Sequence, residues 1–483
     1  MGLRILVLGL ACLFFATAAG ADCTIGLVLG TATRDGCPVI FKNRDITSWS
    51  LEFRTFTPAH AYAYVGNCYR GQSTVWMGVN EVGFGIVQSA AYNLPYGGSG
   101  LGNGTMMAFA LERCVTVEDF AGIVDSTDVT GRATAANFAV VDAYGGGAMF
   151  ECGRTTSARY EPDSLGIIVR ANFAYIGDDG RVGLNRMERA HELLTQAALG
   201  DSLDALFVSK RVVADLYYPG QDPYPLPWTG SFPGMPAGYV NTGPFTGIQT
   251  ICNFNTLASG VVQGVPLGYD PANTLMWCFF GQPALSVPLP IFPASHDEPP
   301  EAVGSPAPMC ALAQEKSEAA FNDPTHEYWL DASHILDLYG DGVMTYAWPA
   351  MDWAHGLVAA TIADWEIDPP SAIERADFQA RLAADLYEIY DSGVLAGVAT
   401  AEPSSAPVLE VFPNPFETSC LIRARAGQGR IEEIEIFDVN GRQVAGSPEA
   451  LTWQPGPLQG AGIYLVRARI GGEVVSRRVI HLK

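Results

Sequence analysis

The chain has 483 residues, of which 48% are hydrophobic and 16% charged, and its formal net charge is −23. So large a hydrophobic fraction excludes wholesale disorder, and the length predicts two or three domains. Because phosphate contacts require clustered Lys and Arg, the acidic balance argues against nucleic acid or anionic lipid as a partner.

The first 21 residues are typical of a secretory signal peptide. Arg4 gives a positively charged start, residues 5–15 form an apolar stretch, and the AGA sequence at 19–21 is a small-residue cleavage site. The apolar stretch is too short for a transmembrane helix, which takes about 20 residues. A lipoprotein anchor at Cys23 is the alternative, although an aspartate directly before the cysteine fits that processing poorly. We therefore expect an exported protein, secreted or held at the cell surface.

Nine cysteines follow the signal peptide, with no CxxC pair among them. An odd number in an exported protein leaves at least one thiol outside the disulfides. Cys37, Cys152 and Cys278 lie in or beside predicted strands, where core thiols or disulfide partners are expected, whereas Cys23 stands two residues beyond the predicted cleavage point. The seven histidines show no HExxH spacing, so we predict no metal and no cofactor.

The body of the chain alternates hairpins with helices. Strands are predicted in pairs at 24–29 and 38–41, at 74–79 and 84–89, and at 138–142 and 148–152. Helical patterns occupy 106–115, 117–123, 186–198 and 203–216. Antiparallel hairpins interleaved with helices predict stacked sheets covered by helices, an α+β layer architecture.

Three later segments complete the predicted organisation. The tract 216–236, rich in Tyr, Pro and Trp, is expected to be a loop that either lines an acyl pocket or packs as a surface excursion. Residues 326–396 are predicted to be helical and to complete the catalytic domain, which would span 22–396. A linker at 397–409 then leads to a small β-sandwich at 410–483, because short alternating strands and an Asn-Gly turn recur there.

The carboxyl-terminal segment resembles the sorting domains of the type IX secretion pathway and related Ig-like modules. The resemblance rests on its FPNPF, FDVNGRQV and GIYLVRARIGG stretches. It implies export, with the secretion machinery as a partner, rather than catalysis.

The amino-terminal segment resembles another family. Cys23-Thr24, the TRDG turn at 33–36 and the KNRD sequence at 42–45 together are similar to the start of N-terminal-nucleophile (Ntn) cysteine hydrolases. These include choloylglycine hydrolases, penicillin V acylases and acyl-coenzyme A:6-aminopenicillanate acyltransferases. GVNEVG at 78–83, NLP at 93–95, VRAN at 169–172, NRMER at 185–189 and the acyltransferase-like WCFFGQPALSVPLP at 277–290 follow in the family's order. The resemblance covers about residues 23–300 and implies a four-layer αββα sandwich.

The residues that carry this resemblance suit amide chemistry. An N-terminal cysteine attacks with its thiol, while its α-amino group, with a pKa near ~7.7–8.0, carries the proton. Asp45 is placed to orient that amine, and the cations Lys42 and Arg44 favour the thiolate. Lys42 stands where the family usually has arginine. Strand alternation puts Lys42 and Arg44 on one face and Asp45 on the other; the alternative is a solvated strand end with an ion pair.

Three further residues match functional positions of the family. Asn93 and Asn172 match asparagines that shape the oxyanion hole and support the leaving group, and Arg186 matches an arginine that acts on the site electrostatically. An amide NH₂ suits an oxyanion hole because it is a neutral donor. The alternatives are an ordinary turn asparagine for Asn93 and a surface arginine at a helix start for Arg186.

The predicted activity is cleavage of a linear carbon–nitrogen amide bond of a small molecule, or transfer of its acyl group, through an acyl-enzyme on Cys23. Signal cleavage leaves Asp22 in front of Cys23, so we expect autocatalysis or a peptidase to remove it. A related cysteine dipeptidase shares the Cys-Thr start and is one alternative. A surface binding protein on a degenerate hydrolase scaffold is the other.

Overall fold

The computed structural model describes residues 22–95, 97–232, 234–243, 249–395 and most of 409–481, without 413–415, 417, 425–430, 439–440, 448–450, 457–458 and 471. The predicted signal peptide lies outside the described residues. So does the predicted linker, except for Leu409, which begins a strand. No helix in these ranges combines the length and apolar character needed to cross a membrane.

The centre of the molecule is a six-stranded antiparallel sheet. Its strands, in spatial order, are β10 (Ile167–Arg170), β1 (Thr24–Val28), β2 (Val39–Asp45), β12 (Thr256–Gln263), β13 (Leu275–Phe280) and β14 (Leu289–Ile291). Every residue of β1, β2, β12 and β13 is buried. Such continuous burial follows because both faces of this sheet are covered.

A seven-stranded antiparallel meander stacks on the first sheet. Its strands follow chain order: β3 (Leu51–Phe56), β4 (Tyr64–Tyr69), β5 (Val75–Asn80), β6 (Gly85–Ala90), β7 (Ala136–Val141), β8 (Gly147–Cys152) and β9 (Ser157–Tyr160). β1 and β2 pack against β6 and β7 across the interface. The three predicted hairpins are confirmed, while β3, β4 and β9 extend the meander beyond them.

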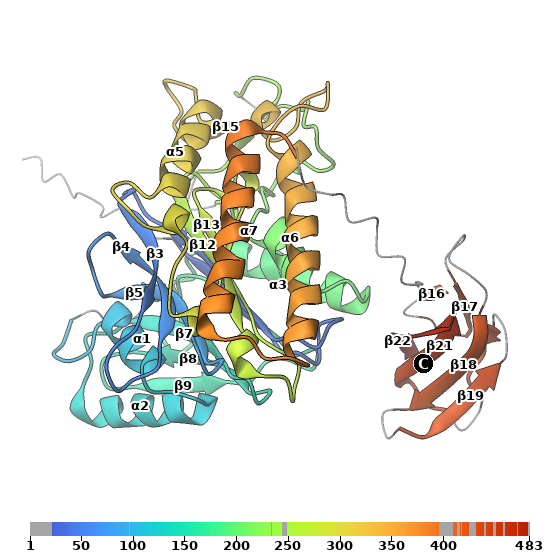
Figure 1. Cartoon of the computed structure of the whole chain (residues 1–483). Coiled ribbons are helices and arrows are strands. Elements are labelled where there is room, and N and C mark those ends of the chain that lie inside the picture. The colour runs from blue at the N-terminus through green and yellow to red at the C-terminus, as the bar shows by residue number, and fades with distance from the viewer. Residues whose placement is uncertain are drawn as a thin grey trace, which may run out of the picture.

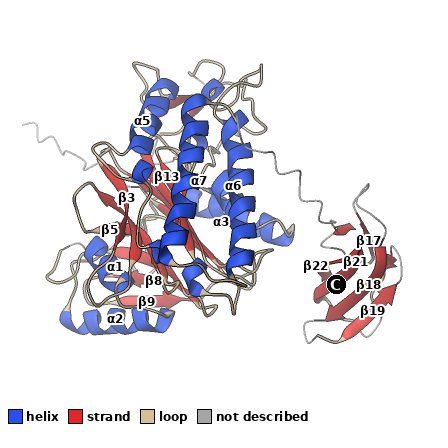
Figure 2. Cartoon of the chain, viewed as in Figure 1, coloured by secondary structure: helices blue, strands red, loops and turns tan. Residues whose placement is uncertain are grey.

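Helices cover the outer faces of both sheets (Figures 1 and 2). α1 (Asn103–Leu111) and α2 (Val117–Thr130) cover the seven-stranded sheet. The six-stranded sheet is covered by α3 (Leu184–Leu199), α4 (Ala205–Phe207), α5 (Pro308–Ala320), α6 (Met344–Trp365) and α7 (Ala372–Ser392). The layer order is therefore αββα, as predicted.

Some local predictions need correction. The single helix expected at 203–216 is a short α4 followed by a π-helix, η1 (Val208–Val212). Residues 326–396 are not wholly helical, because β15 (Trp329–Asp331) pairs with β11 (Tyr239–Asn241) in a separate two-stranded sheet. The short 3₁₀ helices are η2 (Pro271–Asn273), η3 (Pro283–Leu285), η4 (Pro293–Ser295), η5 (Pro300–Ala302) and η6 (Ala332–His334). The nine cysteines are all buried free thiols.

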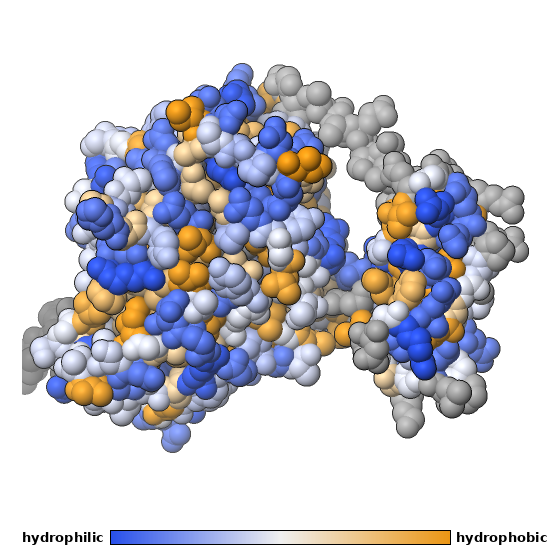
Figure 3. Space-filling view, turned by 60° about the horizontal axis from the view of Figure 1, so that its bottom comes forward, coloured by the Kyte–Doolittle hydropathy of each residue, from blue (hydrophilic) through white to orange (hydrophobic). Residues whose placement is uncertain are grey.

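The described carboxyl-terminal strands form a small β-sandwich with its own apolar core. One sheet contains β16 (Leu409–Phe412), β17 (Cys420–Ala424) and β20 (Leu451–Trp453). The other contains β18 (Ile431–Asp438), β19 (Gln443–Ser447), β21 (Gly462–Ile470) and β22 (Glu473–His481). On the face of the molecule shown in Figure 3, apolar side chains lie in small groups among polar ones.

A half-buried histidine joins α6 to the six-stranded sheet. The imidazole of His355 stacks on Trp277 of β13, with ring centroids 3.7 Å apart and planes 14° apart. Burial, with smaller contributions from Lys210 and Arg34, lowers the pKa of His355 to about 3. Its enclosed Nε2 has no hydrogen-bond partner among the described residues.

This histidine predicts acid sensitivity. The unfolded chain takes up the proton near the ordinary pKa of about 6.5, whereas the folded protein does so only near pH 3. The free energy of unfolding is therefore fully retained above pH 6.5 and falls as the pH decreases below it. We expect His355→Phe to shrink the difference between urea midpoints at pH 7 and pH 4. The exposed His60→Asn should leave it unchanged; an unchanged difference in His355→Phe would contradict the assignment.

Candidate active site

The ends of β1 and β2 place Cys23 beside the KNRD sequence. Thr24 pairs with Asn43 and Ile25 with Lys42, so Cys23, which is 3% exposed, lies next to Arg44 at the end of the hairpin. The two faces of β2 diverge as strand alternation predicts. Lys42 and Arg44 reach the seven-stranded sheet, while Asn43 and Asp45 contact the segments that cover the other face.

Lys42 is a fully buried cation next to the thiol. Its Nζ donates to the carbonyl oxygen of Gln88 in β6 at 2.5 Å and lies in hydrogen-bonding contact with Cys23. Burial lowers the pKa of Lys42 to about 8, and the proximity of Cys23 opposes this shift. A positive charge held against a thiol favours the thiolate. Lys42 can therefore support a nucleophilic sulfur at neutral pH.

Two substitutions of Lys42, one that removes its charge and one that keeps it, test its role through kcat/KM and its dependence on pH. Lys42→Met should lower kcat/KM about 100- to 1000-fold, the range for loss of one preorganised electrostatic donor. Because the Lys42 ammonium loses its proton near pH 8, kcat/KM of the wild type should fall above that pH. Lys42→Arg stays charged and should lack this alkaline decline. A pH–rate profile in which Lys42→Arg declines as the wild type does would contradict the role; Lys316→Met, on α5, is the control.

Arg44 is held between the sheets. Its Nη1 donates to Asn67 Oδ1 at 2.6 Å, and its guanidinium carbon lies 4.4 Å from the Tyr69 ring centroid and 5.0 Å from that of Trp76. Burial lowers the pKa of Arg44 to about 10, against the opposing effects of Tyr69, Cys23 and Cys68. Arg44 remains charged at neutral pH and is a second cation near the thiol.

Asp45 lies on the opposite face of β2 and is 1% exposed. Its Oδ2 accepts from Asn253 Nδ2 at 2.6 Å, and its Oδ1 accepts from the Thr256 hydroxyl at 2.7 Å. Burial raises the pKa of Asp45 to about 7, although Arg186 and these two hydrogen bonds favour the ionised form. Asp45 can therefore change protonation near neutral pH.

Arg186, at the start of α3, contacts Asp45, Asp22, Asn172 and Gln249. Its Nη1 lies 3.6 Å from Asp45 Oδ2 and donates to the carbonyl oxygen of Asp22 at 2.7 Å. Its Nη2 donates to Asn172 Oδ1 at 3.0 Å, and its Nη1 also donates to Gln249 Oε1 at 3.2 Å. Only 2% of Arg186 is exposed, which is inconsistent with a surface arginine at a helix start.

Asp22, the residue before Cys23, is held at both its polar groups. Arg186 binds its main-chain carbonyl oxygen, and Gln249 Nε2 donates to its Oδ2 at 2.8 Å. The carbonyl bound by Arg186 belongs to the peptide bond between Asp22 and Cys23. Two buried side chains therefore hold Asp22, and one of them, Arg186, binds the peptide bond whose cleavage would free the amino group of Cys23.

The two asparagines differ in position. Asn172 is fully buried, accepts from Arg186 and donates from Nδ2 to the Ala90 carbonyl at 3.1 Å, so it belongs to the cluster. Asn93 Nδ2 donates to the carbonyls of Ala174 at 2.7 Å and Asp178 at 2.8 Å, and its Oδ1 accepts from the Ala174 amide. Both amide hydrogens of Asn93 are used to hold this loop, which matches the turn alternative.

Sequence reasoning missed Gln249, Asn253 and Thr256. They lie more than 200 residues after Asp45, in and after the loop that leads into β12, and they reach the site because β12 pairs with β2. No local motif marks them. The neighbouring polar sequence 249–256, just before an apolar strand, was the available signal, since loops at strand ends often carry function.

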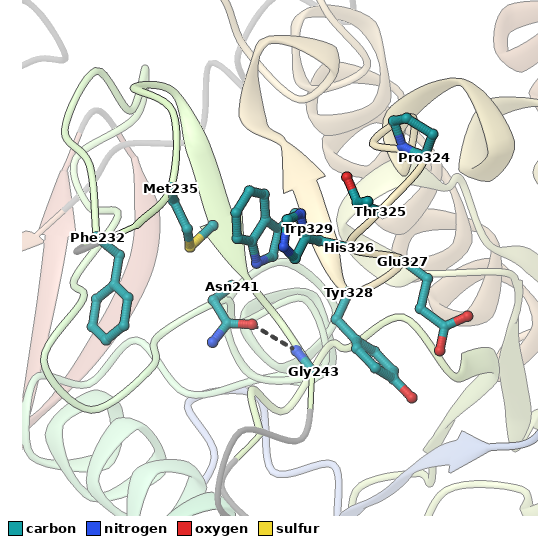
Figure 4. A pocket seen from close by; sticks show the side chains of 10 residues that line it. All are labelled: Phe232, Met235, Asn241, Gly243, Pro324, Thr325, His326, Glu327, Tyr328 and Trp329. Carbon is teal, nitrogen blue, oxygen red and sulfur yellow. Dashed lines mark hydrogen bonds between the residues drawn. The ribbon is translucent and has the colours of Figure 1, made fainter.

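Two cavities are lined in part by residues of the segment 323–329. One, of about 490 Å³, is lined by Phe232, Met235, Asn241, Gly243, Pro324, Thr325, His326, Glu327, Tyr328 and Trp329 (Figure 4). Two of its lining residues belong to the tract 216–236. A second cavity, of about 330 Å³, includes Ile46 and Thr47, which directly follow Asp45, and shares Glu327 with the first. Space for a small molecule therefore adjoins the segment that carries Asp45.

Among the described residues, no group of three or more His, Cys, Asp or Glu side chains is arranged to hold a metal ion.

One protein-family model matches this chain. Residues 32–197 match the family described as acyl-coenzyme A:6-aminopenicillanic acid acyl-transferase. The matched segment is about a third of the chain and contains Lys42, Arg44, Asp45, Asn93, Asn172 and Arg186, but begins after Cys23. This match indicates an enzyme that hydrolyses amides or transfers acyl groups. No curated protein matches the sequence.

Solved structures with partial similarity are also found. A variant of conjugated bile acid hydrolase from Clostridium perfringens is 12% identical, with 56% of this chain and 92% of that chain covered and a TM-score of 0.37. Penicillin V acylase from Agrobacterium tumefaciens is 13% identical, with 56% and 86% covered and a TM-score of 0.34. An N-acylethanolamine-hydrolyzing acid amidase ortholog from Caenorhabditis elegans is 13% identical, with 36% and 78% covered and a TM-score of 0.28.

Proposed function

We propose that this chain is an N-terminal-nucleophile cysteine enzyme, in which the Cys23 thiol attacks a linear amide and forms an acyl-enzyme. The proposal rests mainly on the hydrogen bond that Arg186 donates to the Asp22 carbonyl oxygen. This carbonyl directly precedes Cys23, whose thiol lies beside Lys42. The buried carboxyl of Asp45 completes a cluster that contains a nucleophile, cations and a proton acceptor.

The first reaction of the site is removal of the residues before Cys23. The sulfur attacks the Asp22 carbonyl carbon, a C–S bond forms, the C–N bond breaks, and the thiol proton passes to the nitrogen of Cys23. Water then hydrolyses the thioester, which releases the Asp22 carboxyl end and regenerates the thiol. The Arg186 Nη1 hydrogen bond stabilises negative charge on the carbonyl oxygen as the sulfur adds.

The mature site repeats this chemistry on a substrate. The freed α-amine takes the thiol proton and passes it to the leaving amine. The negative charge of Asp45 balances the positive charges of this amine and of Arg186. Water or a second amine then takes the acyl group, which gives hydrolysis or transfer.

Mass spectrometry of the purified protein tests the proposal. We expect an amino terminus at Cys23 and rapid alkylation of that residue by iodoacetamide, with loss of amide turnover in proportion to alkylation. An active protein that keeps Asp22 would refute the mechanism, because the nitrogen of Cys23 would then be an amide without a basic lone pair.

We also propose that the protein is exported, with the carboxyl-terminal β-sandwich as a sorting domain of the type IX kind. The sandwich has a separate apolar core, as an independently recognised module requires. Removal of residues 410–483 should leave the enzyme inside the cell envelope. Secretion that is unchanged by this truncation would contradict the sorting role.

A further inference from the structure

The residue before Cys23 occupies a built anion site. Arg186 is 2% exposed and Gln249 5% exposed, and both aim a donor at Asp22. Arg186 binds the main-chain carbonyl and Gln249 binds the side-chain carboxylate. The Nε of Arg186 is buried without a hydrogen-bond partner among the described residues.

Removal of Asp22 would take one acceptor from Arg186 and the side-chain acceptor from Gln249 Nε2. A buried donor that loses its partner bears a desolvation penalty of about 1–3 kcal/mol, and more when it is charged. Arg186 would keep Asn172, Gln249 Oε1 and the more distant Asp45, but the Nε2 of Gln249 would lose the carboxylate that it binds here. The mature site therefore gains from a ligand that supplies an oxygen at each of the two vacated positions.

The spacing between the two oxygen-bearing groups of Asp22 indicates the chemical class of that ligand. Its carbonyl carbon is the atom that the Cys23 sulfur would attack, so Asp22 stands where the acyl part of a substrate would stand. Two carbon atoms separate this carbonyl from the side-chain carboxylate. An acyl group with the same spacing is the four-carbon dicarboxylic, or succinyl, group, with or without the amino substituent of aspartate.

We propose that the mature site accepts amides whose acyl group ends in a carboxylate two carbons from the scissile carbonyl, with Gln249 and Arg186 as its binding residues. This inference rests on the proposed function, since it requires that Asp22 be removed from a catalytic Cys23. It adds a specificity that neither the fold nor the family match provides.

Protection of Cys23 from alkylation tests the inference without requiring turnover. The purified mature protein is treated with iodoacetamide in the presence of succinate or of butanoate, and carboxamidomethylation of Cys23 is followed by mass spectrometry. We expect half-maximal protection at a succinate concentration about tenfold lower than for butanoate, because a buried hydrogen bond to a charge contributes about that factor.

Substitutions identify the binding residue. Gln249→Leu removes the donor at similar size, and Gln249→Glu places a negative charge there; both should abolish the advantage of succinate over butanoate. Gln196→Leu, on the exposed side of α3, should keep it. Equal protection by the two acids in the wild type, or an advantage that survives Gln249→Leu, would overturn the inference.

Turnover is measured separately on the same sample, with succinyl and butanoyl anilides as a matched pair. If the wild type turns over the butanoyl compound at least as well as the succinyl one, the inference fails while the proposed function stands. If succinate protects Cys23 but no amide in a broad panel is cleaved or transferred, the proposed function fails and the anion site remains.

Discussion

Cys23→Ala is expected to abolish amide turnover, with a loss of about 10³-fold or more, as for the removal of other covalent nucleophiles. The same substitution should leave Asp22 attached, because the sulfur that attacks the Asp22 carbonyl is gone. Initial rates at saturating substrate and the mass of the amino terminus measure the two effects. Both should appear in one protein, since one thiol performs both reactions.

The matched control is Cys152→Ala. Cys152 is also a fully buried free thiol, but it lies in β8 of the other sheet. Loss of a small buried group should lower the free energy of unfolding by a similar small amount in both variants. Turnover that persists in Cys23→Ala, or that disappears equally in Cys152→Ala, would contradict the role of Cys23. Wild-type protein that binds small amides but never turns them over would favour the binding-protein alternative.

The sequence predicted the parts of the fold that depend on short-range patterns. Apolar, β-favouring stretches joined by Gly-containing turns marked the hairpins β1–β2, β5–β6 and β7–β8, and their stacking under helices follows from the need to bury the apolar faces of both sheets. The order of strands was not predictable, because β12 inserts beside β2 from more than 200 residues away. The π-helix η1 was also missed, since its residues have an ordinary helical pattern.

In the candidate site, too, the sequence predicted what depends on local patterns and not what depends on distant contacts. Lys42, Arg44 and Asp45 were placed correctly on opposite faces of one strand, because alternation along a strand is a local property. The meeting of Arg186 with Asp45 and Asn172 depends on how α3 packs against β1 and β10, which spacing alone does not define. The Asn93 side-chain amide donates both of its hydrogens to the carbonyls of Ala174 and Asp178. The sequence alone does not tell whether such an amide binds these loop carbonyls or faces a substrate.

Arg186→Met is expected to lower the free energy of unfolding by about 3–5 kcal/mol, because it leaves Asp45 buried without its cation. Arg186 also favours the ionised form of Asp45, so its loss should raise the pKa of that carboxyl from its value of about 7. Asp45 would then be protonated and neutral at neutral pH, so it could no longer balance the positive charge of the Cys23 amine. Processing and turnover should both fall, while Arg381→Met, on the exposed side of α7, should change neither.

A double substitution separates the stability effect from the effect on chemistry. In Arg186→Met with Asp45→Asn, no buried carboxylate is left unpaired, so much of the lost stability should return, and urea unfolding of the four proteins in the cycle measures this coupling. Turnover should stay low, because the double variant lacks both the donor to the Asp22 carbonyl and the carboxylate. If the double variant regains activity along with stability, Arg186 acts only through folding, and its proposed role in the chemistry is wrong.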